Sequence, residues 1–289
     1  MADEHSQSRY FLGLTPDEMW RIYLNEGMPG LQKAAPSWMR LVMAIENGML
    51  KSLPSDPRCM WCYAPFRGIG APLMRAMGKS QSRLNPNLCA DCENIVHKHS
   101  GGAEVGLTIL FADLRGSTAL AEGTTPAEFR RLINRFYSTA TKALIDENAL
   151  IEKLIGDEVT AFFVPGLAGA RHARRALDAA DKILLETGHA DAEGPWAPVG
   201  IGLHSGVAYV GVVGHADGVT NLSVLGDVAN TAARLASEAA AGEILFSREA
   251  AENAGIDTTG LETRRLALKG KSEPFQTWVI TVDRDIPPV

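Results

Sequence analysis

The chain has no long apolar run and no excess of positive charge. It is 289 residues long and carries 28 lysines and arginines against 34 aspartates and glutamates, a net charge of −6. A surface that binds nucleic acid normally shows a basic patch, so the charge balance argues against that class of partner. No apolar stretch approaches the roughly 18–20 residues of a membrane-spanning helix. We therefore expect neither a nucleic-acid-binding protein nor a membrane span.

The chain also lacks the features of a secretory signal. Its first residues, Met1–Ser6, are polar and acidic, whereas a signal begins with basic residues followed by an apolar segment. Hydrophobic residues make up 46% of the chain and charged residues 21%, which is the composition of a soluble globular protein. We therefore expect a cytoplasmic protein.

Cysteine is scarce, and all four cysteines fall within one short segment. They form two Cys-x-x-Cys pairs separated by 26 residues, Cys59 with Cys62 and Cys89 with Cys92. In a cytosolic protein this layout predicts a four-cysteine zinc site. The segment between the pairs has few long apolar runs, so it needs such a cross-link to fold. An iron–sulfur cluster and a redox-active dithiol remain alternatives, because the spacing suits them as well.

We divide the chain into four parts by composition. Residues 1–53 hold a tail and a helical region, because Thr15-Pro-Asp-Glu18 is a capping box and apolar residues then recur at helical spacing. Residues 54–100 hold the cysteines, residues 101–283 form the main domain, and residues 284–289 are a short tail. The helical region is either a packing element or a regulatory arm that positions the main domain.

The main domain alternates strand and helix patterns and contains no internal repeat. A second capping box, Thr125-Pro-Ala-Glu128, opens a helix that runs to about Glu147. We expect a pair of strands at 149–164 and single strands at 198–204, 207–213, 220–225, 243–246, 263–268 and 275–282. We expect one helix at 168–187, a second that Asp227 caps and that ends at Gly242, and a third that starts at Ser247. This α/β order with paired strands predicts a ferredoxin-like core with additions.

Two aspartates stand where apolar strand patterns end. Thr108–Ala112 has the pattern of a buried strand that is followed by Asp113, and Gly156-Asp157 has the pattern of a tight turn between two strands. Neighbouring strands that each end in a carboxylate suit hard divalent cations, which prefer oxygen ligands. Ser117 and Thr118 begin a predicted short helix whose free N–H groups attract phosphate. The pattern therefore indicates a metal and phosphate site.

Six segments, taken in order, resemble the catalytic domain of class III nucleotidyl cyclases, the adenylate and guanylate cyclases. The segments are Phe-Ala-Asp-Leu-Arg-Gly-Ser-Thr at 111–118, Lys-Leu-Ile-Gly-Asp-Glu at 153–158, Gly-Ile-Gly-Leu-His-Ser-Gly at 200–206, Gly-Val-Val-Gly at 211–214, Leu-Gly-Asp-Val-Ala-Asn-Thr-Ala-Ala-Arg-Leu at 225–235 and Leu-Lys-Gly-Lys at 268–271. The resemblance covers about residues 105–282. It implies a mixed, mainly antiparallel sheet with flanking helices.

The resemblance implies a two-metal site at the ends of these strands. Asp113, Asp157 and the backbone carbonyl of Leu114 would bind two Mg²⁺ or Mn²⁺ ions, which act on the ribose 3′-hydroxyl and the phosphates of one nucleotide. The segment Gly116–Thr118 would contact the phosphates. A helix cap at Asp113 and a turn residue at Asp157 are the structural alternatives.

The resemblance also implies that two copies of the chain share each site. Asn230 would orient the ribose and Arg234 would neutralise charge that develops on the phosphates. They are four residues apart and share one helix face, and in the family this face meets the metal site of the other protomer. A head-to-tail homodimer with two equivalent sites follows. An ordinary helix pair between Arg234 and Glu238 is the alternative.

Lys153 and Ser223 match the positions that select the purine. A lysine at the first position favours ATP, so the expected reaction converts ATP to 3′,5′-cyclic AMP and pyrophosphate. Ser223 differs from the aspartate that the family often has at the second position. A guanylate or dual-specificity cyclase therefore remains an alternative, as does a nucleotide-binding domain without catalytic activity. Lys271, or alternatively Lys269, matches the lysine that contacts the triphosphate.

The cysteine segment directly precedes this domain, where cyclases of the class commonly carry regulatory elements. His97 and His99 lie nearby and are substitute ligands, although four cysteines make a complete set. We hypothesise that the module sets dimer geometry, and with it activity, through residues 93–104. A metal or redox sensor whose only output is dimerisation is the alternative.

Overall fold

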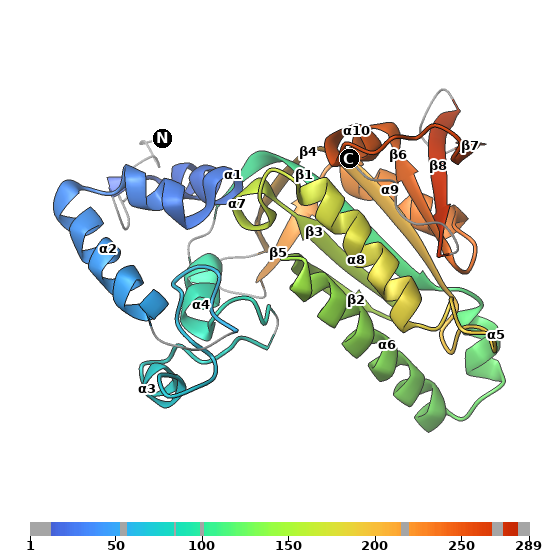
Figure 1. Cartoon of the computed structure of the whole chain (residues 1–289), viewed down its shortest axis with the longest axis horizontal. Coiled ribbons are helices and arrows are strands. Elements are labelled where there is room, and N and C mark those ends of the chain that lie inside the picture. The colour runs from blue at the N-terminus through green and yellow to red at the C-terminus, as the bar shows by residue number, and fades with distance from the viewer. Residues whose placement is uncertain are drawn as a thin grey trace, which may run out of the picture. The chain divides into compact units, whose positions relative to one another are not determined.

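The computed structural model describes residues 13–52, 57–83, 85–98, 101–214, 220–267 and 274–282, and Figure 1 shows its elements. The chain forms two compact units. The first contains residues 1–105, 165–167 and 209–224, and the second contains residues 106–164, 168–208 and 225–289. The helical region and the cysteine segment therefore belong to one unit, which we call the cysteine unit. We call the second one the sheet unit.

In the part of the cysteine unit that the structure describes, four helices precede the first strand. They are α1 (Pro16–Ala34), α2 (Ser37–Ser52), α3 (Ala71–Ala76) and α4 (Ala90–Lys98). The predicted capping box starts α1, because the Thr15 side chain accepts a hydrogen bond from the Glu18 amide and the Glu18 side chain returns one to Thr15. Gly27 bends the helix, since its φ of 66° lies outside the helical region.

Close backbone contact fixes α1 near its bend. A Cβ atom added to Gly27 would lie 2.2 Å from the carbonyl oxygen of Gly166, and one added to Gly166 would lie 2.0 Å from the carbonyl oxygen of Tyr23. No side chain fits between these two segments, so both positions need glycine. The indole of Trp61, in the cysteine segment, stacks on Tyr23 of the same helix with ring centroids 4.3 Å apart.

Within the described residues, eight strands form one mixed sheet. They are β1 (Gly102–Leu114), β2 (Leu150–Ile155), β3 (Glu158–Phe163), β4 (Val199–Gly214), β5 (Thr220–Leu225), β6 (Glu243–Ser247), β7 (Glu262–Leu266) and β8 (Phe275–Thr281). The order is β2-β3-β1-β4-β6-β8-β7, and β5 pairs with β4. β1 with β3, β2 with β3, β6 with β8 and β7 with β8 are antiparallel, whereas β4 with β6 is parallel. The predicted mixed, mainly antiparallel sheet is confirmed.

Two elements differ from the sequence prediction. The strands expected at 198–204 and 207–213 are one continuous strand, β4, in which Ser205, at the expected break, is fully buried. Asp227 is not the N-cap of its helix, α9 (Asp227–Glu238). Gly226 takes that position, and no side chain caps the helix. α9 ends at Glu238, before the predicted Gly242.

Helices α6 (Pro126–Asp146) and α8 (His172–Glu186) pack together over β2 and β3 (Figure 1). The predicted second capping box starts α6, with Thr125 and Glu128 exchanging hydrogen bonds. Phe136, Leu144, Leu177 and Ile183 are fully buried in the core beneath these helices. Three shorter helices complete the sheet unit, α5 (Ser117–Glu122), α9 and α10 (Arg248–Ala254), and α7 (Pro165–Ala168) lies at the boundary of the two units.

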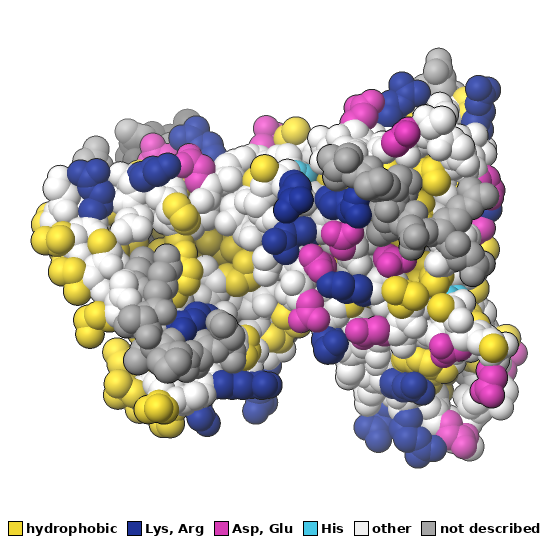
Figure 2. Space-filling model, in the orientation of Figure 1, with side chains coloured by type: hydrophobic (Ala, Val, Ile, Leu, Met, Phe, Trp, Pro, Cys, Tyr) yellow, Lys and Arg dark blue, Asp and Glu magenta, His cyan; other side chains and the backbone are white. Residues whose placement is uncertain are grey.

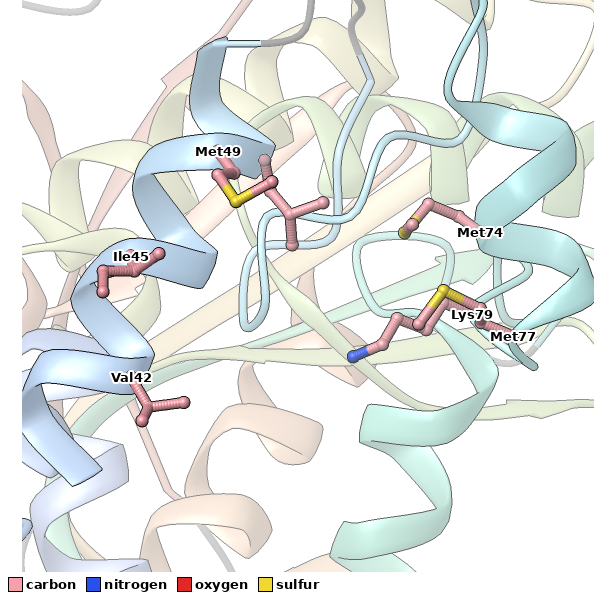
Figure 3. A pocket seen from close by; sticks show the side chains of 7 residues that line it. Val42, Ile45, Met49, Met74, Met77 and Lys79 are labelled. Carbon is pink, nitrogen blue, oxygen red and sulfur yellow. The ribbon is translucent and has the colours of Figure 1, made fainter. Parts of the chain in front are cut away.

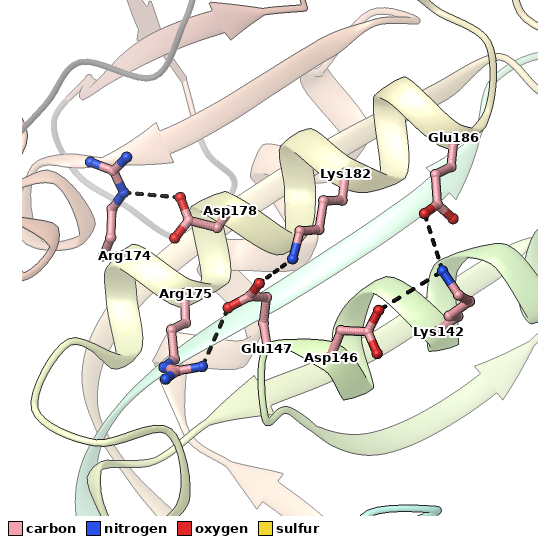
Figure 4. Close-up of polar contacts among 8 residues, drawn as sticks. All are labelled: Lys142, Asp146, Glu147, Arg174, Arg175, Asp178, Lys182 and Glu186. Atoms are coloured by element: carbon pink, nitrogen blue, oxygen red, sulfur yellow. Dashed lines mark hydrogen bonds and ion pairs between the residues drawn. The ribbon is translucent and has the colours of Figure 1, made fainter. Parts of the chain in front are cut away.

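Ion pairs join the exposed faces of α6 and α8 (Figure 4). Glu147, at the end of α6, accepts hydrogen bonds from Lys182 and from Arg175, the latter over 3.4 Å. Lys142 of α6 lies 3.4 Å from Glu186 of α8. The hydrogen bond from Lys182 to Glu147 raises the pKa of Lys182 above its ordinary value. These pairs add electrostatic contacts to a packing that the apolar core already fixes.

The cysteine unit exposes an apolar surface over α2 and α3 (Figure 2). Trp38, Leu41, Val42, Ile45 and Met49 follow one stripe of α2, and each is more than half exposed. A groove of about 320 Å³ lies between the two helices. Figure 3 shows its apolar walls, which come from Val42, Ile45, Met49, Leu50, Met74 and Met77, with Lys79 at one side. No helix in the described part of the chain combines the length and the hydropathy that crossing a membrane requires.

Candidate active site

The two candidate metal-binding aspartates meet at one edge of the sheet. Asp113 ends β1 and pairs in register with Glu158 at the start of β3. The amide of Leu114 donates a 3.1 Å hydrogen bond to the carbonyl oxygen of Asp157. Asp157 stands in the tight turn between β2 and β3, where Gly156 takes a φ of 63°. Antiparallel pairing thus brings together carboxylates that are 44 positions apart in the sequence.

Three carboxylates and one guanidinium share this edge. Asp113 and Asp157 are half-buried, and Arg115 forms an ion pair with Asp113. Burial lowers the pKa of Arg115, while Asp157 and Glu158 act in the opposite direction. Burial raises the pKa of Glu158, and the nearby charge of Asp157 raises it further. Oxygen ligands crowded in this way favour binding of a divalent cation, so the donor set fits Mg²⁺ or Mn²⁺.

Arg115 also has a structural role. Its guanidinium donates a 3.1 Å hydrogen bond to the carbonyl oxygen of Ser237, in the last turn of α9. Its backbone amide donates to the carbonyl oxygen of Pro198 over 2.7 Å. The residue therefore links the end of β1 to α9 and to the segment before β4.

Tyr137 positions the turn that carries Asp157, a role that the sequence analysis missed. Its hydroxyl donates a 2.9 Å hydrogen bond from α6 to the carbonyl oxygen of Gly156. Burial raises the pKa of Tyr137, and the charges of Asp157 and Glu158 raise it further. No local motif marks this contact, because the two residues are 19 positions apart and meet only when α6 packs on the hairpin.

The segment Gly116–Thr118 leads directly from the carboxylate edge into α5. Gly116 is in the left-handed conformation with a φ of 68°, and Ser117 starts the helix as predicted. No side chain of the segment caps α5. The first backbone N–H groups of the helix therefore have no side-chain cap.

Lys153 lies on β2, the other strand of the hairpin that contains Asp157. A register shift occurs between Ile151 and Lys153, and the ammonium group of Lys153 lies 3.1 Å from Glu152. Its side chain is 45% exposed, so it is accessible to a ligand. Ser223 lies on β5, belongs to the cysteine unit and is buried.

Asn230 and Arg234 lie on α9, outside its buried stripe. Val228, Ala232 and Leu235 face the core, whereas Asn230 is exposed and Arg234 is half-buried. In the described part of the chain no ion pair joins Arg234 to Glu238. The alternative that Arg234 only pairs with Glu238 along the helix is therefore not supported. Lys269 and Lys271 lie outside the described residues.

The four cysteines form a compact cluster in the cysteine unit. Their sulfur atoms all lie within 4.8 Å of one another, and those of Cys62 and Cys89 are 3.7 Å apart. A tetrahedral zinc site with Zn–S bonds of about 2.3 Å has sulfur atoms about 3.8 Å apart, so the arrangement fits zinc. A disulfide needs sulfurs about 2.05 Å apart, and all four cysteines are free.

Backbone amides already face the sulfur atoms. Cys59 accepts hydrogen bonds from the amides of Cys62, over 3.5 Å, and Cys89, over 3.3 Å. Cys89 accepts one from the amide of Cys92 over 3.4 Å. Hydrogen bonding among the thiols lowers the pKa of Cys62 and of Cys89 and raises the pKa of Cys59 and of Cys92. A metal ion would bind the deprotonated form of each thiol.

His204, on β4, has no role in either cluster. It is buried, and its Nδ1 lies 2.7 Å from the hydroxyl of Ser247. A second buried polar group joins β1 to α8, since the hydroxyl of Thr108 contacts His172 over 3.0 Å and Ser205 over 2.7 Å. Both histidines are satisfied inside the core.

Comparison with known proteins identifies relatives of residues 103–281. This range matches the family model described as the adenylate and guanylate cyclase catalytic domain. An adenylate cyclase of Anabaena cylindrica is 36% identical over 135 residues, which are 45% of this chain and 26% of that protein. An adenylate cyclase of Mycobacterium tuberculosis (strain ATCC 25618 / H37Rv) is 32% identical over 177 residues, 60% of this chain and 39% of that protein. The match thus spans about a quarter to two fifths of these relatives' own lengths.

Solved structures give the same result for the fold. The guanylyl cyclase Cya2 has a TM-score of 0.56 and 26% identity, covering 62% of this chain and 92% of that chain. The adenylyl cyclase CyaB from P. aeruginosa has a TM-score of 0.55 and 27% identity, covering 64% of this chain and 98% of that chain. The resemblance and the fold inferred from the sequence are confirmed. Because these neighbours include both adenylyl and guanylyl cyclases, they identify the family and not the base.

Proposed function

Because the chain belongs to the family of adenylate and guanylate cyclase catalytic domains, we propose that it converts ATP to 3′,5′-cyclic AMP and pyrophosphate. The observation that carries this proposal is the carboxylate edge, where Asp113 and Asp157 come together at the ends of paired strands. In the reaction, the ribose 3′-hydroxyl loses its proton and its oxygen bonds to the α-phosphorus. The bond from that phosphorus to the departing pyrophosphate breaks.

Asp113, Asp157 and the backbone carbonyl of Leu114 would hold two Mg²⁺ or Mn²⁺ ions. When bound, such ions help to ionise the hydroxyl and offset the negative charge of the phosphates. The protein's own part is to hold the oxygen ligands in place. Arg115 binds Asp113 from one side, and Tyr137 fixes the turn at Gly156, so both carboxylates are held before substrate arrives. The backbone of Gly116–Thr118 would face the phosphates.

Asn230 and Arg234 would complete the site from a second copy of the chain. They present an amide and a guanidinium on the side of α9 away from its buried stripe, where Asn230 is exposed and Arg234 half-buried, and these groups suit a ribose oxygen and a charged phosphate. In a head-to-tail homodimer this face would meet the carboxylate edge of the partner, giving two equivalent sites.

Selection of ATP would rest on Lys153. Its ammonium group can donate a hydrogen bond to N1 of adenine, whereas guanine presents an N–H donor there. Ser223 would contribute a small hydroxyl as an acceptor for the adenine amino group. Lys271, with Lys269 as the alternative, would contact the triphosphate.

We further propose that the four cysteines bind one Zn²⁺ as a structural ion. The sulfur spacing supports zinc, which prefers four thiolates in a tetrahedron. An iron–sulfur cluster is the alternative, and the ultraviolet–visible spectrum of the purified protein separates them, because only the cluster absorbs in the visible. Metal analysis should give one zinc per chain.

The catalytic proposal is tested by product analysis with purified protein. ATP and GTP are supplied separately, first with Mn²⁺ and then with Mg²⁺, and Asp113→Asn serves as an isosteric control. We expect cyclic AMP from ATP and a loss of at least about a hundredfold in the variant, since it removes a metal ligand without changing shape. Formation of cyclic GMP from GTP at an equal or higher rate would overturn the ATP assignment. No product from either nucleotide would contradict the activity itself.

A further inference from the structure

Helix α9 lies directly against the backbone of β4. A Cβ atom added to Gly202 would lie 2.1 Å from the amide nitrogen of Ala236, in the last turns of the helix. A Cβ atom added to Gly206 would lie 2.7 Å from a methyl group of Val228, in the first turn. Glycine in a strand is typical of such close backbone approach. The helix is therefore seated on β4 at both of its ends, and β4 is the neighbour of β1 in the sheet.

The C-terminal end of α9 is also tied to the end of β1. The guanidinium of Arg115 donates a 3.1 Å hydrogen bond to the carbonyl oxygen of Ser237. The hydroxyl of Ser237 in turn donates a 2.8 Å hydrogen bond to the carbonyl oxygen of Arg234. A cation at this end of a helix also suits the negative end of the helix dipole. The helix turn that follows Arg234 is therefore fixed by the residue two positions after Asp113.

The same arginine side chain holds the carboxylate edge. The guanidinium of Arg115 forms an ion pair with the carboxylate of Asp113, and its Nε donates a 3.4 Å hydrogen bond to the carbonyl oxygen of that residue. A guanidinium carries several N–H donors in a rigid planar fork, so one side chain can bind two elements at once. A lysine ammonium is a single point charge on a flexible stem and lacks this geometry.

We propose, on the basis of the proposed function, that Arg115 is a positioning residue that couples the two nucleotide sites of the homodimer. In that function Asp113 of one protomer serves one site, whereas Asn230 and Arg234 of the same protomer serve the other. Arg115 contacts both Asp113 and the last turn of α9, and all of these residues belong to the sheet unit. A displacement of the carboxylate edge in one site therefore displaces the α9 groups that complete the other site.

The test places the Arg115 change in a chain whose own carboxylates do not take part in catalysis. Asp113→Asn and Arg234→Ala chains are mixed, so that the working site combines the carboxylate edge of the second chain with α9 of the first. Arg115→Gln is then added to the Asp113→Asn chain. We expect the recovered activity to fall about tenfold, because a small misplacement of a catalytic group costs up to about a hundredfold. Recovery within twofold would mean that Arg115 serves only its own Asp113, and would overturn the proposal.

Two other variants of the Asp113→Asn chain control this result. Arg174→Gln is the matched control, because Arg174 is 22% exposed, against 21% for Arg115, and forms its ion pair with Asp178 along α8. It should leave the recovered activity unchanged. Arg115→Lys keeps the positive charge but not the fork, so we expect most of the loss to remain. Full activity with lysine would mean that charge alone suffices, and would contradict the two-sided contact.

Hydrogen exchange provides a readout that needs neither metal nor turnover. It is measured on the amides of residues 234–238 in the full-length wild type, Arg115→Gln and Arg174→Gln proteins. We expect faster exchange only in Arg115→Gln, and unchanged exchange would contradict the anchor on α9. If the two starting variants do not complement each other, the shared site of the proposed function fails, and the coupling of sites fails with it. If they complement but Arg115→Gln has no effect, only the coupling fails.

Discussion

The cysteine cluster and the carboxylate edge are assembled in different ways. The cluster takes all four ligands from two short motifs, and they already lie within 4.8 Å of one another. The carboxylate edge joins residues from two strands and a turn, and its proposed partners Asn230 and Arg234 lie on α9. Two short motifs therefore define the cysteine cluster, whereas the proposed nucleotide site would depend on sheet pairing and on a second chain.

The two regions also differ in what stabilises them. Large apolar side chains such as Phe136, Phe162 and Phe163 are fully buried in the sheet unit. Between residues 57 and 92 the buried residues are mostly small or are the cysteines themselves, together with Trp61, Met74 and Leu88. We infer that the cysteine segment depends on its metal, while the sheet unit folds on its own apolar core.

The largest expected effect comes from removing a metal ligand of the cysteine cluster. Cys59→Ser replaces a fully buried sulfur that accepts two amide hydrogen bonds. We expect zinc affinity to fall by more than the roughly 10–100-fold that an outer-shell change costs. Near-ultraviolet circular dichroism should lose the signal of Trp61, while far-ultraviolet dichroism keeps most of the sheet signal. Wild-type zinc binding in this variant would contradict the four-ligand site.

The next largest effect is expected at the proposed nucleotide site, in the selection of ATP over GTP. Lys153→Glu replaces a donor with an acceptor at the position proposed to read N1 of the purine. We expect the ratio of kcat/KM for ATP over GTP to fall about 10–100-fold, as expected for one reversed polar contact. Lys142→Glu is the matched control, because it reverses the charge of an exposed lysine in the same unit, and its ratio should stay unchanged. An unchanged ratio in Lys153→Glu would remove this residue from base selection.

A smaller effect is expected where α1 contacts Gly166. Gly166→Ala would place a Cβ atom 2.0 Å from the carbonyl oxygen of Tyr23, so backbone must move. We expect the free energy of unfolding to fall by about 1–3 kcal/mol and zinc release to quicken. Gly106→Ala is the control, because nothing lies within 4 Å of the added atom. Equal stability of the two variants in denaturant titrations would contradict the close contact.

The smallest effect is expected from the ion pairs of α6 and α8. Glu147→Gln removes the acceptor of Lys182, and we expect a loss of about 0–1 kcal/mol because Lys182 is 42% exposed. The folded-state pKa of Lys182 is raised, so its contribution is present below the ordinary value of 10.5 and is lost as pH rises through the folded pKa. Thermal unfolding at pH 8 and pH 11 measures this. A difference between wild type and variant that grows at pH 11 would contradict the assignment.

Much of the fold follows from local signals in the sequence. Both capping boxes, at Thr15 and Thr125, start helices as predicted, and the turn at Gly156 separates two strands. The predictions were wrong where tertiary packing decides the structure. β4 continues through the buried Ser205, and Asp227 follows the helix cap at Gly226 instead of forming it.

In the candidate sites, too, only some features could be predicted from local sequence signals. The placement of Asp113 and Asp157 at the ends of neighbouring strands and the clustering of the four cysteines were predictable from motif and spacing. The contacts of Tyr137 with Gly156 and of Tyr23 with Trp61 were not, because they join residues that are distant in sequence through helix packing. The roles of Lys153, Ser223, Asn230 and Arg234 stay predictions.

Complementation between two inactive variants tests the shared nucleotide site most directly. Asp113→Asn and Arg234→Ala proteins are assayed separately and then after mixing in equal amounts. In a head-to-tail homodimer, half of the mixed dimers are heterodimers with one intact site of two, so about a quarter of the wild-type activity should return. Recovery at this level, with each variant inactive alone, is the predicted result. No recovery in a mixture that size-exclusion chromatography shows to exchange subunits would contradict the shared site.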